Sequence, residues 1–214
     1  MTDQSVTGCF SVAGKQSVSR HTGITAVILA GGRAQRMDGI DKGLALLDDH
    51  PLISWVLECI APQVDEVFIS ANRNLDQYQQ FGHRVLTDIS PDFQGPLAGL
   101  SRAMSDAAHS LVLCVPCDTP FLPDDLVERL TVALEKSGTD LAIPVCNGRA
   151  HRAVCLCRRN LLPSLENFLA QGGRRVGEWQ STLQYIEVPF DDEHAFSNIN
   201  TAAELVRHEK HTPL

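Results

Sequence analysis

Apolar positions in the first half of the chain alternate between short runs rich in β-branched residues and longer segments with helical spacing. The strand-like runs are Ile24 to Ala30, Val64 to Ser70, Arg84 to Thr87 and Ser110 to Pro116. The helix-like segments between them are Pro51 to Ala61, Asn74 to Phe81 and Gly95 to Ala108. Strands and helices that alternate in this order predict a mostly parallel sheet with helices on both faces.

The second half is less regular but continues the alternation. The predicted strands are Leu141 to Val145, Ala153 to Cys157 and Leu183 to Val188. The predicted helices are Leu126 to Glu135, Leu161 to Ala170 and Ala202 to His208. No internal repeat or low-complexity linker divides the sequence. We therefore predict one three-layer, Rossmann-like α/β domain over residues 24–210.

Composition limits the classes of function. The 214 residues can bury a sizeable core, and the formal net charge of -8 argues against a general binder of nucleic acid or of membrane surfaces. No apolar run approaches the roughly 20 residues of a membrane span. Residues 1–23 lack the apolar block of a signal peptide, so we expect a flexible extension that the fold does not need.

Seven cysteines, an odd number in mostly apolar surroundings, indicate reduced thiols in a cytoplasmic protein. Cys114 and Cys117 have the spacing of a zinc or redox half-site. Cys155 and Cys157, however, are only two positions apart and fall on one face of a predicted strand, where cysteine behaves as a small hydrophobe. Buried core thiols are therefore favoured over metal or redox use.

The loop after the first predicted strand carries the strongest chemical signal. It contains the adjacent pair Gly31-Gly32 and the cationic side chains of Arg33, Arg36 and Lys42. Glycines let phosphate oxygens approach backbone N–H groups, and cationic side chains neutralise the incoming charge. The pattern indicates a phosphate-binding loop on an otherwise acidic protein. A surface loop with incidental glycines is the alternative.

Two common phosphate motifs do not fit this loop. A Walker A loop ends in glycine, lysine and serine or threonine, whereas Lys42 lies between Asp41 and Gly43. A dinucleotide-binding fingerprint needs three spaced glycines, whereas Gly31 and Gly32 are adjacent. A P-loop NTPase and a nicotinamide-dependent dehydrogenase are both disfavoured.

Polar residues follow the carboxyl ends of the predicted parallel strands, where open α/β sheets bind their ligands. They are Ser70, Asn72, Asp88 and Asp118. Asp118 is placed to ligate Mg²⁺, which takes one or two carboxylates and completes its shell with phosphate oxygens and water. An N-cap of the following helix is the alternative for Asp118, and a turn-forming aspartate is the alternative for Asp88.

Four motifs in order resemble the molybdenum cofactor guanylyltransferase family, from about Thr25 to about Arg207. They are Leu29-Ala30-Gly31-Gly32 with Arg36-Met37 and Asp41-Lys42-Gly43, then Gly95-Pro96-Leu97-Ala98-Gly99, Pro116-Cys117-Asp118-Thr119-Pro120 and Asn198-Ile199-Asn200-Thr201. The first motif alone is shared with many nucleotidyltransferases, whereas the ordered set is specific.

The resemblance implies Mg²⁺-dependent transfer of GMP from GTP to the terminal phosphate of Mo-molybdopterin, with release of pyrophosphate. The phosphate acceptor is already an anion, so the reaction needs cations and a metal rather than a side-chain nucleophile. The resemblance also implies transient contacts with proteins that deliver molybdopterin and with the enzymes that receive the cofactor. No binding to nucleic acid or membrane is expected.

The resemblance assigns residues on the donor side. Leu29, Ala30 and Gly31 are expected to contact the guanosine through their backbones, and Gly32 to keep the loop open. Arg36 and Lys42 are the candidates for phosphate binding and transition-state stabilisation. Asp118 is the expected Mg²⁺ ligand. The nucleotide-binding set is Leu29, Ala30, Gly31, Gly32, Lys42, Ser70, Asp88 and Asp118. Ser70 stands where the family often has asparagine, so Asn72 is also considered.

On the acceptor side, the resemblance points to Asn198 and Asn200 in an extended loop, together with Arg174 and Arg175. The alternative for the two arginines is a solvated basic dipeptide after a glycine pair.

Two other functions remain open. One is a related transferase that makes a cytidine dinucleotide of molybdopterin or an activated sugar. Gly31-Gly32, where cytidylyl relatives typically resemble Ala-Gly, and the run Pro96 to Gly99 favour guanine. The other is a GTP-binding protein without transferase activity, for which the sequence lacks a Walker A lysine and an Asn-Lys-x-Asp motif.

Overall fold

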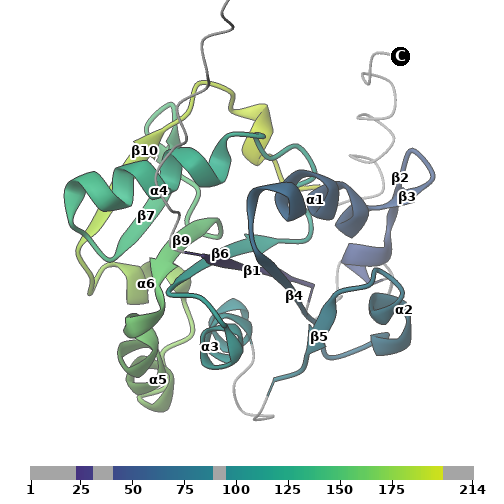
Figure 1. Ribbon diagram of the computed structural model, residues 1–214, viewed down its shortest axis with the longest axis horizontal. Helices are drawn as coiled ribbons and strands as arrows, with labels where there is room; N and C mark the ends of the chain where they lie inside the picture. Colours follow the sequence, from purple (N-terminus) through teal and green to yellow (C-terminus); the bar gives the residue numbers. More distant parts are fainter. Residues whose placement is uncertain (1–22, 31–40, 89–94, 200–214) are drawn as a thin grey trace, which may run out of the picture.

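The computed structural model describes residues 23–30, 41–88 and 95–199. Its centre is an eight-stranded sheet in the order β10-β7-β9-β6-β1-β4-β5, with β8 paired to β7 (Figure 1). The strands are β1 (Ile24–Leu29), β4 (Glu66–Ser70), β5 (Arg84–Leu86), β6 (Leu111–Pro116), β7 (Leu141–Cys146), β8 (Arg149–Ala150), β9 (Cys155–Arg158) and β10 (Tyr185–Pro189). A separate hairpin joins β2 (Leu46–Leu47) and β3 (His50–Pro51).

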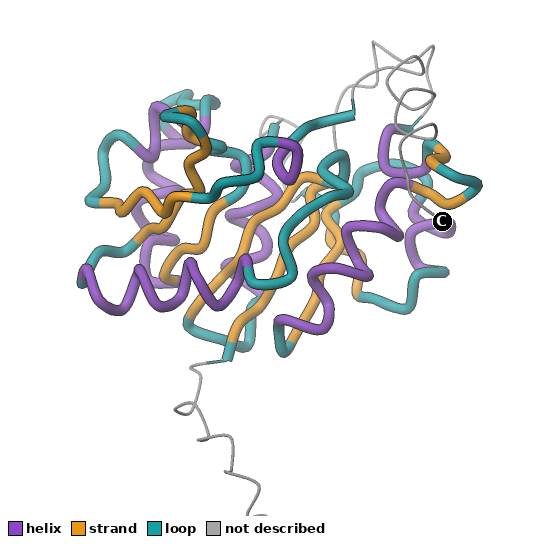
Figure 2. Tube along the Cα trace, turned by 90° about the horizontal axis from the view of Figure 1, so that it is seen from above, coloured by secondary structure: helices purple, strands orange, loops and turns teal. Residues whose placement is uncertain are grey.

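The α-helices lie on both faces of this sheet (Figure 2). They are α1 (Leu52–Ile60), α2 (Leu75–Gln79), α3 (Pro96–Asp106), α4 (Leu126–Ser137), α5 (Leu162–Ala170) and α6 (Val176–Gln180). Short 3-10 turns are η1 (Lys42–Leu44), η2 (Ala61–Gln63), η3 (Arg159–Leu161) and η4 (His194–Phe196).

β1 lies at the centre because its run of apolar residues can be covered on both faces. Residues 24–28 are all buried. β1 pairs in parallel with β4 on one side and with β6 on the other, so that Leu29 is opposite Ser70 and also opposite Pro116. The carboxyl ends of these three strands therefore meet at one edge of the sheet.

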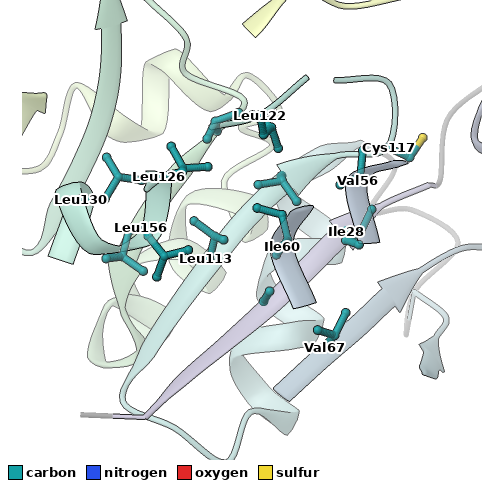
Figure 3. Packing of buried hydrophobic residues seen from close by; sticks show 14 of the residues in the cluster. Ile28, Val56, Ile60, Val67, Leu113, Cys117, Leu122, Leu126, Leu130 and Leu156 are labelled. Atoms are coloured by element: carbon teal, nitrogen blue, oxygen red, sulfur yellow. The ribbon is translucent and has the colours of Figure 1, made fainter. Parts of the chain in front are cut away.

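Alternate side chains of the strands build two cores. Ile28, Val67 and Leu113 face the side of α1 and α4, and Figure 3 shows them in one apolar cluster with Ile60 and Leu130. The opposite side chains of the same strands face α3, α5 and α6. This three-layer arrangement confirms the fold class expected from the sequence.

The mostly parallel sheet contains one antiparallel insertion that the strand pattern alone did not reveal. After β7, the chain turns through Asn147 and Gly148, both with positive φ, and returns as β8 and then β9. β9 runs antiparallel to β6 and to β7, between which it lies. A strand that returns through a short turn must run antiparallel, because a parallel partner needs a crossover.

Three other elements were missing from the sequence-based prediction: the β2–β3 hairpin, β8 and α6. Two-residue strands and a five-residue helix are too short to show periodicity. α6 nevertheless carries Trp179, which is fully buried between the helices of its face. The bounds of most other elements differ from those predicted by one or two residues.

Among the described residues, Cys59 is partly buried and the other five cysteines are buried, as expected for core thiols. Cys114, Cys155 and Cys157 are buried together on the face of α3, α5 and α6. Cys117 belongs to the opposite core, beneath α1 and α4. Cys114 and Cys117 therefore lie on opposite faces of the sheet, and burial raises the pKa of the Cys117 thiol.

Several residues singled out in the sequence lie outside the described ranges. They are Gly31, Gly32, Arg33, Arg36, Asn200, the helix predicted at 202–208 and all of the N-terminal extension except Gly23. The single-domain range 24–210 stays a prediction. In the part of the chain that the structure describes, no helix has both the length and the apolar character needed to cross a bilayer.

Gly99 offers a test of how closely α3 approaches the sheet. A Cβ at this position would lie 2.5 Å from Ser70 Oγ and 2.8 Å from Leu29 Cδ2. We expect Gly99→Ala to lower the free energy of unfolding by about 1–3 kcal/mol through overpacking, as measured by urea denaturation. The matched control is Gly177→Ala in α6, where the new Cβ meets only the flexible Arg152 side chain, at 3.3 Å. Equal losses in the two variants would contradict the tight contact.

Candidate active site

The carboxyl edge of the sheet is held together by hydrogen bonds that continue past the strand ends. The backbone N–H of Ala30 donates to the carbonyl of Ser70 at 2.8 Å. The N–H of Cys117 donates to the carbonyl of Leu29 at 3.1 Å. These bonds fix the direction in which the chain leaves β1, β4 and β6. They also place Asp118, one residue beyond Cys117, at the edge where the sequence predicted it.

Lys42 and Asp118 form an ion pair at this edge, although 76 residues separate them in the sequence. The ammonium group of Lys42 donates to Oδ2 of Asp118. The Asp118 side chain is only 11% exposed, and its other oxygen, Oδ1, is buried with no hydrogen-bond partner among the described residues. A buried carboxylate oxygen without a donor is rare and costly, which marks Oδ1 as a candidate ligand atom.

Asp118 does not cap the following helix. α4 begins at Leu126, with Asp125 in the N-cap position. The turn that carries Asp118 is held instead by Thr119, whose hydroxyl donates to the Pro116 carbonyl at 3.0 Å. This geometry removes the alternative interpretation of Asp118 as a helix cap.

Lys42 is presented by η1, and Asp41 anchors this turn. Asp41 Oδ1 accepts hydrogen bonds from the Gly43 N–H at 3.3 Å and from the Tyr78 hydroxyl at 2.5 Å. Asp41 Oδ2 accepts a hydrogen bond from Asn74 Nδ2 at 3.0 Å. Tyr78 belongs to α2 and Asn74 immediately precedes it, so this helix fixes the loop that carries the lysine.

Asp88 is held by Asn72 through a reciprocal pair of hydrogen bonds. Asn72 Nδ2 donates to Asp88 Oδ2 at 2.8 Å, and the Asp88 N–H donates to Asn72 Oδ1 at 2.9 Å. Oδ1 of Asp88 is buried without a hydrogen-bond partner in the described structure. Burial raises the pKa of the Asp88 carboxyl above its usual value, and the Asn72 bond offsets this only in part. Asn72 therefore orients Asp88.

Ser70 has a packing role in this edge. Its side chain is buried, and its Oγ faces the position where a Cβ of Gly99 would stand. A larger side chain than serine would press on α3 at this point. The serine found where the resembling family often has asparagine is thus small enough for the close approach of Gly99.

The chain returns to Asp118 near the end of the described residues. The N–H of Ile199 donates to the backbone carbonyl of Asp118 at 2.9 Å. The Ile199 side chain is fully buried against Leu47 and Leu52. Asn198, which is exposed, therefore lies beside the turn that carries Asp118, and its role on the acceptor side stays a prediction.

The two arginines proposed for the acceptor side are held in the turn between α5 and α6. Arg174 donates to the backbone carbonyls of Leu169 and Gly173 at 3.0 and 2.7 Å. Arg175 is 83% exposed at its side chain and pairs with Glu178 at 3.1 Å. Arg174 is thus partly committed to its own turn, whereas Arg175 is open to solvent.

The donor set at this edge fits a magnesium ion that is shared with a nucleotide. Among the described residues, no three His, Cys, Asp or Glu side chains gather as a ready-made metal cluster. Mg²⁺ needs no such cluster, because one carboxylate oxygen together with phosphate and water oxygens completes its octahedron. The buried, unpartnered Oδ1 of Asp118 is a suitable oxygen.

The carboxyl edge of this mostly parallel sheet thus carries a lysine–aspartate pair and a second oriented carboxylate, groups that suit the binding of phosphate and a metal ion. The family model of the MobA-like NTP transferase domain matches residues 26–184. The chain belongs to this family.

Relatives named molybdenum cofactor guanylyltransferase match most of the chain. The protein from Ralstonia nicotianae is 45% identical over 191 residues, which cover 85% of this chain and 94% of its own length. The protein from Cupriavidus necator is 47% identical, with 87% and 96% covered. The chain is thus a member of the molybdenum cofactor guanylyltransferase group, as the sequence motifs indicated.

Solved structures agree. Molybdopterin-guanine dinucleotide biosynthesis protein A from Archaeoglobus fulgidus superposes with a TM-score of 0.72 at 25% identity, covering 87% of this chain and 97% of that one. A 4-diphosphocytidyl-2C-methyl-D-erythritol synthase from Anaerococcus prevotii reaches a TM-score of 0.67 at 12% identity, covering 89% and 98%. The second likeness shows that the fold is shared with other nucleotidyltransferases.

Sequence reasoning missed the contacts that hold the site residues. Asp41 was noticed only as the neighbour of Lys42, and Tyr78 only as part of a helix. Nothing in the local pattern pairs residues 37 positions apart. The polar residues Asn72 and Asn74, which both follow the end of β4, were the one available signal, because loops after strands often carry site residues.

The pKa of Asp88 leads to a pH-dependent prediction. The unfolded carboxyl titrates near 3.9, and the raised native pKa means that ionisation above this pH opposes folding. The folded protein keeps the Asp88 carboxyl protonated to a higher pH than the unfolded chain does. The stability that this protonation gives is lost as the pH rises through the pKa of the folded state. We expect Asp88→Asn to become more stable relative to the parent between about pH 4 and pH 7, as measured by urea denaturation across this range. A difference that stays constant or shrinks would contradict the burial effect.

Proposed function

We propose that this chain transfers GMP from GTP to the terminal phosphate of Mo-molybdopterin and releases pyrophosphate, with Mg²⁺ as cofactor. The names of the relatives, molybdenum cofactor guanylyltransferases, support the two substrates. The observation that carries the proposal is the Lys42–Asp118 pair at the carboxyl edge, with the Asn198 segment tied to the same aspartate. Lys42, Asp118 and the segment around Asn198 lie together at this edge, and such a group of residues suits a reaction that joins two phosphates.

On the donor side, Leu29 is the last residue of β1 and Ala30 follows it, and their backbones would contact the guanosine. Asp88 would accept hydrogen bonds from the nucleoside through Oδ1, which lacks a donor in the described structure. Nucleoside N–H and O–H groups would satisfy this oxygen and favour the charged carboxylate. By the family resemblance, Gly31 would contact the guanosine, Gly32 would keep the loop open, and Arg36 would bind phosphate. Ser70 would support this edge by packing against Gly99 of α3.

The chemical step joins an acceptor phosphate oxygen to the α-phosphorus of GTP while the bond from that phosphorus to the bridging oxygen breaks. The electron pair of the broken bond leaves on pyrophosphate, so negative charge grows on the leaving group. Lys42 is placed to stabilise this charge through its ammonium group. The acceptor oxygen is ionised beforehand, so no side chain has to remove a proton.

Asp118 would hold Mg²⁺ through Oδ1. The bound ion would add positive charge beside the phosphates and help to orient them. Before substrate arrives, the ammonium group of Lys42 pairs with the largely buried side chain of Asp118.

On the acceptor side, Asn198 and Asn200 would bind the molybdopterin phosphate or its pterin, together with Arg174 and Arg175. Arg175 is the more available of the two arginines, because its side chain is exposed. We place the reaction in the cytoplasm and expect transient contacts with proteins that supply molybdopterin and with molybdoenzymes that take the product.

The direct test uses GTP labelled at the α-phosphate, Mg²⁺ and Mo-molybdopterin, with CTP in a parallel reaction and a control that lacks the acceptor. We expect labelled guanine dinucleotide and one pyrophosphate per product, and no reaction without the acceptor. Hydrolysis of GTP without dinucleotide would overturn the transferase proposal. Preference for CTP would identify a cytidylyltransferase instead.

Asp118→Asn provides a residue-level test. Loss of the carboxylate should lower kcat by about 10²–10³-fold, the usual cost of losing one group that stabilises developing charge. The matched control is Asp106→Asn, because Asp106 is also largely buried and pairs with Arg84 and Arg102 at 2.6 and 3.1 Å outside the site. We expect the control to lose stability without losing turnover. Equal kcat in Asp118→Asn and the parent would end the assignment of Asp118.

A further inference from the structure

We infer that Tyr78 and Asn74 are positioning residues that hold Lys42 in register with Asp118 by clamping Asp41. This inference rests on the proposed function, because it explains how the reacting cation is placed. Asn74 and Tyr78 both donate to the carboxylate of Asp41, the residue immediately before Lys42 in the sequence.

We call the bonds from Asn74 and Tyr78 to the Asp41 carboxylate the clamp. Three donors surround this carboxylate: the Gly43 N–H, the Asn74 amide and the Tyr78 hydroxyl, at 3.3, 3.0 and 2.5 Å. Two of the three donors, Asn74 just before α2 and Tyr78 within it, are 33 and 37 positions from Asp41 along the chain. A helix turn of three residues has little stability of its own, so these long-range bonds fix the orientation of η1.

Tyr78 also packs where the Lys42-Gly43 segment meets the Cys117-Asp118 segment. A Cβ on Gly43 would lie 2.6 Å from the Tyr78 hydroxyl and 3.3 Å from the sulfur of Cys117. Gly43 therefore fits between a residue of α2 and the residue that precedes Asp118. The pairs Lys42-Gly43 and Cys117-Asp118 lie side by side, and the buried Tyr78 packs against them.

Tyr78 acts as a hydroxyl donor across the whole working pH range. Burial raises the pKa of the Tyr78 phenol far above its usual value, and the hydrogen bond to Asp41 raises it further. The donor to Asp41 is therefore not lost by ionisation. This role differs from the general acid or base role often taken by active-site tyrosines, because Tyr78 is fully buried and its bond is made to Asp41.

The loop after β4 connects Asp88 on the nucleoside side with Asp41 on the phosphate side. Asn72 orients Asp88, and Asn74, two residues later, binds Asp41. Asn74 has a φ of 50°, in the left-handed region that asparagine tolerates better than most residues. This bend directs the two asparagines to different carboxylates, so the loop after β4 fixes the nucleoside side and the phosphate side together.

The test compares Tyr78→Phe and Asn74→Ala with the matched control Tyr185→Phe. Tyr185 is the other tyrosine of the chain, and its hydroxyl accepts a hydrogen bond from Arg152 at 3.1 Å, outside this clamp. We expect each clamp variant to lower kcat about tenfold, the scale of one lost hydrogen bond to a charged group, and the control to keep the parent kcat.

A second readout does not depend on turnover. Limited acylation of amines followed by mass spectrometry gives the labelling of Lys42 relative to Lys136, an exposed residue of α4. We expect this ratio to rise severalfold in both clamp variants, because a loosened η1 separates Lys42 from Asp118. If the parent lacks transferase activity, the labelling ratio of Lys42 to Lys136 still tests the clamp. Failure of the proposed function can therefore be told apart from failure of this inference.

A double-mutant cycle tests the route through Asp41. In an Asp41→Ala background, Tyr78→Phe should change kcat and the labelling ratio by less than about twofold, because neighbours that act as one unit are not additive. If Tyr78→Phe lowers the melting temperature but leaves kcat and the Lys42 ratio at parent values, Tyr78 is only a core residue and the inference is wrong. Asn74 is exposed, so Asn74→Ala gives the same decision if Tyr78→Phe does not fold.

Discussion

The ion pair between Lys42 and Asp118 is the interaction on which the site depends. A pair of this kind gives little net stability, because removing both charges from water costs about as much as their attraction returns. The ion pair matters because it fixes where the two side chains lie. The pair holds a cation and a carboxylate at the edge where β1 and β6 end, and the parallel register that sets Leu29 opposite Pro116 determines where that edge lies.

The site is built at some expense of stability. Asp88 and Asp118 each carry a buried oxygen that no donor satisfies among the described residues. A fold selected for stability alone would pair or expose these oxygens. Both oxygens instead face the edge that, under the proposed function, binds the nucleotide and its metal. The bonds that hold the rest of each residue, from Asn72 to Asp88 and from Lys42 to Asp118, keep the unsatisfied oxygens in place until a substrate arrives.

The sequence was sufficient for the fold class and for the identity of the edge residues. Long apolar strands and helices such as β1 and α4 show their periodicity clearly, and a residue that follows such a strand must lie at its carboxyl edge, which located Asp118. The supporting contacts were not accessible in this way. The antiparallel course of β9 depends on a two-residue turn, and the bonds that hold Asp41 depend on how α2 docks, which only tertiary packing decides. Sequence patterns thus show which residues lie at the end of a strand, but not which contacts hold them there.

The most direct measurement is a crystal structure with Mg²⁺ and a non-hydrolysable analogue of GTP. The account predicts that Lys42 leaves Oδ2 of Asp118 for a nucleotide phosphate, that Oδ1 of Asp118 contacts the bound cation, and that Asp88 Oδ1 receives a hydrogen bond from the nucleoside. An intact Lys42–Asp118 pair with the nucleotide bound elsewhere would contradict the central claim that this pair is the resting form of the catalytic site.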